Sequence, residues 1–265
     1  PLGVQRADIV RTLAAVVDHH DMFRSRLISD GRGWGMSVSE PGTVDVEDLL
    51  SRVDVDAAAD ESTIVLTASK GLDEALGRLN PADGVMVQFV WVDFGPTRTG
   101  RLIIAAHHLI VDGVSWRIIV PDLVSAAAQM AGASGATGDV AGTTGDVALE
   151  PTGTSMRRWA HALSEEAHRD SRVAELDTWR KVLQTPDPVL GKRAYDSAVD
   201  VAATVQRISV TVPTQVTETL LTTLPEVFNG GANDGLLAGL ALALIEWRRR
   251  AGIDSTSALL QLEGH

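Results

Sequence analysis

The segment 107–113, which reads HHLIVDG, constrains the fold of this chain more than any other feature, because the pattern around it predicts that a strand ends and a helix begins there. The mostly apolar run 101–107 predicts a strand that is buried on both faces. After residue 113 the apolar residues recur with the period of a helix. A second strand is predicted over 85–92, with a loop at 95–100 between the two. These elements predict a mixed α/β fold.

Further elements are predicted on both sides of this pair. An amphipathic helix is expected over 7–17, followed by a hairpin formed from 23–28 and 34–38. The remaining predicted elements are helices at 60–79, 155–167, 173–183, 213–224 and 233–249 and strands at 204–212 and 258–262. The low-complexity segment 131–153 predicts a mobile crossing loop. We therefore place a lobe boundary after this loop, between the parts 1–153 and 154–265.

Charge and composition exclude several classes of function. The chain has 23 Lys plus Arg against 35 Asp plus Glu, a net charge of -12, and this acidity disfavours nucleic-acid binding. It has no cysteine, which removes disulfides and thiolate metal sites and fits a reducing cytoplasm. No apolar run approaches the ~20 residues of a membrane span, so we expect no membrane association. The N-terminal residues lack the pattern of a signal peptide.

The two adjacent histidines are candidates for acid/base chemistry. Successive strand residues point to opposite faces, so one of His107 and His108 would enter a cavity while the other packs behind it. This geometry argues against both side chains binding one metal ion, and no metal site is expected. A histidine at this place could act as a general base near neutral pH. A purely structural histidine pair is the alternative that residue chemistry leaves open.

The helix that follows could supply hydrogen-bond donors. Gly113 permits a tight turn or a positive φ where the chain enters the helix. The first N–H groups of a helix have no partner within it, and such donors can stabilise a developing oxyanion. The residues that would supply them are Val114, Ser115 and Trp116.

The complete HHLIVDG string, between a buried strand and an amphipathic helix, resembles the signature of the condensation-domain superfamily. The resemblance implies a two-lobed fold of the chloramphenicol acetyltransferase type. It also implies that His108 faces the tunnel where the acyl groups on two carrier arms meet, with His107 structural. The upstream segment 19–27, HHDMFRSRL, resembles the arginine-bearing segment of that family and implies that Arg24 pairs with Asp112. We interpret His19 and His20 as ordinary helix-terminal residues.

Three further segments resemble the epimerization domains of nonribosomal peptide synthetases. The string HLIVDGVSWRI at 108–118 is similar to that branch, and 229–240 resembles its Asp-x-Leu-Leu helix motif. The end of the chain, LEGH at 262–265, matches the start of its Glu-Gly-His-Gly-Arg-Glu motif. This resemblance implies that His108 and Glu263 remove and return the Cα proton of an aminoacyl or peptidyl thioester on opposite faces.

The same resemblance implies what the chain would work with. No metal or redox cofactor of its own is required, because the phosphopantetheine arm belongs to a peptidyl carrier protein. Upstream adenylation and downstream condensation modules are the other implied partners. The family's first strand has no counterpart before Pro1, and the final motif stops at His265. We therefore expect a nearly complete N-terminal lobe over 1–153, and linker helices with a partial C-terminal lobe over 154–265. Alone, these residues would not form a competent site.

Two alternatives remain open at this point. A condensation domain would use His108 to position or deprotonate an incoming amine and so form a peptide bond. A noncatalytic relative would recruit another protein. Recruitment domains of this family often lose part of the histidine-aspartate-glycine string, so the intact string argues against that interpretation.

Overall fold

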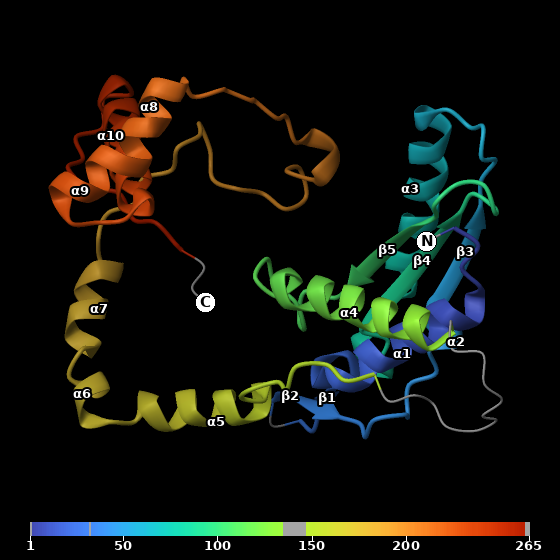
Figure 1. The fold of residues 1–265 in the computed structure, drawn as a ribbon. Coiled ribbons are helices and arrows are strands. Elements are labelled where there is room, and N and C mark those ends of the chain that lie inside the picture. Colours follow the sequence, from blue (N-terminus) through green and yellow to red (C-terminus); the bar gives the residue numbers. More distant parts are fainter. Residues whose placement is uncertain (1, 32, 135–146, 263–265) are drawn as a thin grey trace. The chain divides into compact units, whose positions relative to one another are not determined.

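The computed structural model describes residues 2–31, 33–134 and 147–262 (Figure 1). They fall into two compact units, Pro1–Ala162 and Leu163–His265. The first unit contains α1 (Arg6–His19), η1 (Asp21–Arg24), β1 (Ser25–Ser29), β2 (Trp34–Val38), α2 (Val46–Leu49), β3 (Leu50–Asp54), α3 (Glu61–Arg78), η2 (Pro81–Asp83), β4 (Val87–Asp93), β5 (Arg101–Ala106) and α4 (Trp116–Ser134). The mixed α/β prediction is confirmed, and the lobe boundary after residue 153 stays a prediction.

The later elements are helical. After α5 (Met156–Ala167), which crosses the boundary between the units, come α6 (Asp170–Val173), α7 (Leu176–Leu183), η3 (Ala202–Thr204), α8 (Thr214–Glu218), η4 (Thr219–Thr223), α9 (Leu224–Phe228) and α10 (Ala232–Arg250). The segment η4 is a π-helical turn between α8 and α9. None of the helices in the described ranges has both the length and the apolar character needed to cross a membrane.

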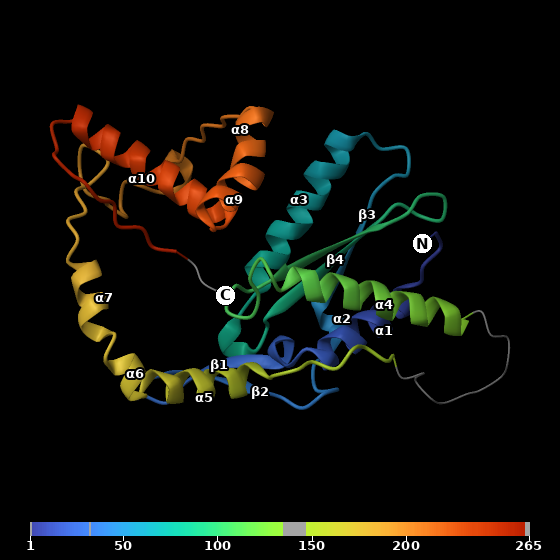
Figure 2. The same cartoon turned by 60° about the vertical axis from the view of Figure 1, so that its left-hand side comes forward.

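A three-stranded sheet with β4 in the middle organises the first unit. β3 runs parallel to β4, and β5 runs antiparallel to it with Val87 opposite Ala106. Consecutive residues of β4 point to opposite faces of the sheet. Phe89 packs with α1 and α4, whereas Val90 packs with α3. Figure 2 shows α3 on one side of the sheet and α4 on the other. The unit is therefore a three-layered α/β/α arrangement whose core surrounds β4.

Several predicted elements match the structure closely. The helix predicted at 7–17 is α1, and the predicted hairpin is the antiparallel pair of β1 and β2. The helix predicted at 60–79 is α3, which begins where the Asp60 side chain accepts a 2.8 Å hydrogen bond from the N–H of Thr63. The helix predicted at 233–249 is α10.

Other predictions are wrong in detail. β5 is half-exposed rather than buried on both faces, because it lies at the edge of the sheet. Residues 205–212 form no strand: in the part of the chain that the structure describes, no strand pairs with them, and Ile208 remains 89% exposed. The described residues at 258–262 are likewise not a strand. The short strand β3, which the sequence did not reveal, supplies the parallel partner of β4 instead.

Candidate functional site

The two motif histidines lie just past the end of β5. The N–H of His107 donates to the carbonyl of Met86 at 2.8 Å, which extends the pairing with the start of β4. Its ring Nδ1 accepts a hydrogen bond from the N–H of Leu109 at 3.1 Å, so Nδ1 is an acceptor and the ring braces the turn. His108 is the first residue of that turn and its side chain is exposed. His107 thus makes its contact within the turn, and the exposed side chain of His108 is open to a ligand.

Asp112 caps the start of α4. Its Oδ1 accepts hydrogen bonds from the N–H of Val114 at 3.0 Å and from the N–H and hydroxyl of Ser115, both at 2.7 Å. In return the N–H of Asp112 donates to the hydroxyl of Ser115 at 3.1 Å. Two of the three N–H groups predicted to hold an oxyanion thus donate to this carboxylate. Of the three predicted oxyanion donors, the N–H of Trp116 is the one that remains a candidate.

Gly113 lies in the same turn, but the structure does not demand a glycine there. Its φ is outside the left-handed region that favours glycine. A Cβ at this position would meet no atom within 4 Å among the described residues. Gly113 therefore lies in a turn, as the sequence permits, but without the positive φ that glycine would also allow.

Arg24 is buried, with 5% of its surface exposed, but it does not form the predicted ion pair. Its Nε donates to the carbonyl of Ser39 at 3.0 Å and its Nη1 to the carbonyls of Val17, at 2.9 Å, and Asp18. Its Nη2 pairs with Asp21 at 2.9 Å. Among the hydrogen bonds and ion pairs between described residues, none joins Arg24 to Asp112. Arg24 instead ties the end of α1 to the segment after β2, because its donors meet carbonyls at both places.

A cavity of about 180 Å³ lies beside the motif turn in the first unit. Ile110, Val111 and Ser115 of the turn line one side, and His20 and Met22 line another. His108 is not among its lining residues. The second predicted acid/base group, Glu263, lies outside the described residues. The structure therefore neither joins nor separates His108 and Glu263.

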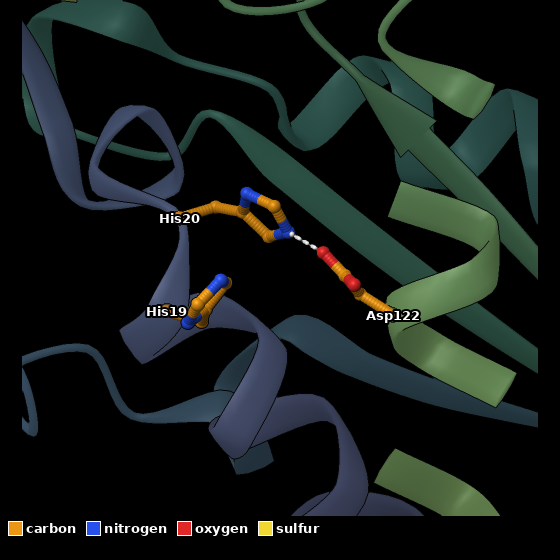
Figure 3. Close-up of side chains that lie close together, drawn as sticks. All are labelled: His19, His20 and Asp122. Atoms are coloured by element: carbon orange, nitrogen blue, oxygen red, sulfur yellow. Dashed lines mark hydrogen bonds and ion pairs between the residues drawn. The ribbon is translucent and has the colours of Figure 1, made fainter. Parts of the chain in front are cut away.

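His20 has a partner that its sequence context did not suggest. Its Nε2 lies 2.9 Å from Oδ2 of Asp122 on α4, in a pair separated by 102 residues (Figure 3). Burial lowers the pKa of His20 below its ordinary value of 6.5. The neighbouring charge of His19 lowers this pKa as well, while Asp122 acts in the opposite direction. No spacing rule links the two residues, because only the packing of α1 against α4 brings them together.

Comparisons with known proteins give a consistent picture. Residues 3–254 match the family described as Condensation domain. The chain is 30% identical to a polypeptide of the linear gramicidin synthase of Brevibacillus parabrevis over 266 residues, covering 99% of this chain and 5% of that protein. It is 31% identical to a chondramide synthase of Chondromyces crocatus over 255 residues, covering 93% of this chain and 6% of that protein. The chain thus spans a small part of the length of these relatives.

Solved structures show the same likeness in fold. The epimerization domain from the third module of tyrocidine synthetase B superposes with a TM-score of 0.74 at 21% identity, over 93% of this chain and 52% of that one. The SgcC5 protein from Streptomyces globisporus superposes with a TM-score of 0.61 at 19% identity, over 94% of this chain and 52% of that one. The predicted fold of the chloramphenicol acetyltransferase type is therefore confirmed.

Proposed function

Because this chain belongs to the condensation-domain family, we propose that it epimerizes the Cα of an aminoacyl or peptidyl thioester during nonribosomal peptide synthesis. A peptidyl carrier protein would present this substrate on its phosphopantetheine arm. The observation that carries the proposal is the intact HHLIVDG segment at the junction of β5 and α4, with an exposed His108. Adenylation and condensation modules of the same assembly line would supply and consume the substrate.

The proposed reaction needs two acid/base groups. One group removes the Cα proton, and the electron pair of the C–H bond moves into the thioester carbonyl to give an enolate. The other group returns a proton to Cα on the opposite face, so no atom is gained or lost. His108 and Glu263 are the proposed pair, and histidine titrates near neutral pH, which suits proton transfer in both directions. The N–H of Trp116 is the proposed donor to the enolate oxygen.

Epimerization is favoured over peptide-bond formation by the sequence at both ends of the proposed site. The string HLIVDGVSWRI at 108–118 and the terminal LEGH at 262–265 resemble the epimerization branch. The fold likeness to the tyrocidine synthetase epimerization domain agrees with this choice. Condensation is the second candidate, because the matching family is described by that activity. A recruiting, noncatalytic role is disfavoured by the intact motif.

Exchange of the Cα proton with solvent separates these functions. The longest natural polypeptide that carries this sequence is incubated in deuterium oxide with a carrier protein loaded with an aminoacyl thioester. We expect deuterium to appear at Cα and the stereochemistry to equilibrate, as measured by mass spectrometry and chiral chromatography. Joining of two loaded carriers without any deuterium incorporation would overturn epimerization and establish condensation.

Substitutions at the two proposed acid/base residues test the mechanism in the same assay. We expect His108→Ala and Glu263→Gln each to slow the exchange by about 10²–10⁴-fold, the usual contribution of a general acid or base. His161→Ala, at an exposed position of α5, is the matched control and should exchange at the wild-type rate. Unchanged circular-dichroism melting curves establish folding. Full activity in either variant would remove that residue from the mechanism.

A further inference from the structure

A second cluster of titratable side chains lies apart from the motif turn, where the end of α1 meets α4. It consists of His19, His20 and Asp122, and each is half-buried. One ligand atom from each residue, an imidazole nitrogen or a carboxylate oxygen, lies within 4.8 Å of the other two. Figure 3 shows the His20 ring and the Asp122 carboxylate facing each other, with the His19 ring beside them. The proposed epimerization uses none of these residues.

His20 and Asp122 are held close together and away from most solvent. Their side chains are 15% and 16% exposed, and the nitrogen and oxygen that face each other are 2.9 Å apart. Asp122 can only accept a hydrogen bond, so Nε2 of His20 donates to it while no metal is bound. A metal ion can displace this proton, because a neutral imidazole can instead carry its proton on Nδ1 and give the lone pair of Nε2 to the metal. The nitrogen nearest the carboxylate is therefore a competent ligand.

His19 has a buried nitrogen that lacks a partner. Its Nε2 is inaccessible to solvent and forms no hydrogen bond with any described residue. A buried polar atom without a partner is unfavourable, and native proteins satisfy nearly all of them. The His19 ring lies edge-on to the ring of His20, with 4.9 Å between their centroids. A metal ion that accepts a lone pair from each ring would give the buried nitrogen of His19 a partner and bind His20 at the same time.

The spacing of the three groups fits a small divalent transition metal. Zinc is bound at roughly 2.0–2.2 Å by imidazole nitrogens and carboxylate oxygens, so neighbouring ligand atoms lie about 3–3.5 Å apart. The His20–Asp122 distance of 2.9 Å is already near this value. The remaining distances, all below 4.8 Å, would close after movements on the order of 1 Å. Such movements are within reach of side-chain rotation.

We propose that His19, His20 and Asp122 form a binding site for a divalent transition-metal ion of the zinc type. Two imidazoles and one carboxylate are a ligand set that zinc accepts readily, with a fourth position left for water or another ligand. The site borders the cavity beside the motif turn at one ligand, because His20 is among the residues that line that cavity. An ion at this site ties the end of α1 to α4, the helix that begins at the motif.

Zinc binding by the full chain and its variants tests the proposal. The wild-type chain is dialysed against micromolar ZnCl₂, and bound zinc is counted by mass spectrometry. We expect about one ion per chain and a higher melting temperature with zinc than with EDTA, because a ligand that binds only the folded state stabilises it. His19→Ala, His20→Ala and Asp122→Asn should each lose most of the bound zinc. His161→Ala, which removes an exposed histidine of α5, should keep it.

Cobalt gives a second readout that depends on the ligands. Co²⁺ bound in a tetrahedral site absorbs visible light, and this absorption should vanish in His20→Ala but persist in His108→Ala. Asp122→Asn keeps a hydrogen-bond acceptor beside His20, so loss of binding in this variant cannot be attributed to unfolding if its melting curve is preserved. A folded wild-type chain that binds no zinc would overturn the proposal. So would zinc that stays bound to His20→Ala and leaves in His108→Ala.

Discussion

The carboxylate of Asp112 stabilises the motif turn as a helix cap, because it accepts hydrogen bonds from the N–H groups of Val114 and Ser115. We expect Asp112→Ala to lower the free energy of unfolding by about 1 kcal/mol, because the N–H groups of Val114 and Ser115 lose their acceptor. Asp112→Asn keeps an acceptor oxygen and should cost less. Urea denaturation of the three proteins measures the difference. A loss of about 3–5 kcal/mol for Asp112→Ala would contradict the cap and indicate a broken buried ion pair.

The free energy of unfolding should depend on pH in a way that reflects the ionisation of His20. Its pKa is lower in the folded protein than its ordinary value of 6.5, chiefly through burial and also through the neighbouring His19 and Arg24, while Asp122 acts in the opposite direction. As the pH falls below that value, the unfolded chain binds a proton that the folded chain resists. Protonation therefore favours the unfolded state, and the stability attributable to neutral His20 is present near pH 7.5 and declines towards pH 5.

The comparison of wild type with His20→Gln isolates this effect. Denaturation is measured at several values between pH 5 and pH 7.5, and His161→Gln serves as an exposed control. We expect the wild type to lose stability relative to His20→Gln as the pH falls, and no such trend for the control. A wild type that gains relative stability on acidification would show that the attraction of Asp122 outweighs burial.

At the residue scale, the sequence could predict which residues form the motif but not what each of them contacts. His107, Asp112 and Ser115 make their contacts within the turn itself, so strand and helix patterns could locate that turn, but they did not predict that Ser115 would donate to Asp112. Arg24 and His20 find their partners through tertiary packing, and the family resemblance directed Arg24 to the wrong one. No local pattern encodes such long-range partners.

At the scale of single elements, the packing of α3 on the sheet offers a sharp test. A Cβ at Gly71 would lie 3.1 Å from a methyl group of Val53 and 3.1 Å from one of Val90. A Cβ at Gly77, in the same helix, would meet no atom within 4 Å among the described residues. We expect Gly77→Ala to stabilise the protein by about 0.5–1 kcal/mol through helix propensity.

Gly71→Ala should not give the stabilisation expected for Gly77→Ala. It should leave the stability unchanged or lower it by about 1 kcal/mol, because the added methyl group crowds a packed core. Thermal or urea denaturation of both variants against wild type measures the difference. Equal stabilisation by the two substitutions would show that α3 lies farther from β3 and β4 than the structure places it.

Elements with their own periodicity were predictable, and elements defined by a partner were not. α1, α3 and α10 each carry an apolar repeat or a capping residue that marks them in the sequence. The alternating run at 204–212 has the pattern of a strand, yet a strand requires a neighbour to satisfy its backbone. β3 is short and follows α2 directly, so it has little pattern of its own. Its pairing with β4 becomes visible only in the folded unit.

At the scale of the whole molecule, burial is concentrated in the first unit. Among the described residues, the buried hydrophobic side chains all lie between Leu13 and Met130, around β4. In the described part of the second unit, Arg248 is the one buried residue, and it pairs with Asp187 at 2.6 Å. Tyr195, Ile208 and Val210 of that unit are each more than three-quarters exposed. Hydrophobic burial is the main source of stability in a folded domain, so the two units differ in their resistance to local opening.

Hydrogen exchange of two helices of nearly equal length tests this difference. α3 has 18 residues and packs Ile64 and Ala75 against the sheet, whereas α10 has 19 residues and buries only Arg248 among its described side chains. A helix that buries little apolar surface is only marginally stable in water. We therefore expect the amides of α10 to exchange at least about 100-fold faster than those of α3, or roughly 2.7 kcal/mol in opening free energy. Mass-spectrometric exchange corrected for intrinsic rates measures this ratio, and equal protection would mean that α10 gains a packing surface absent from its own unit.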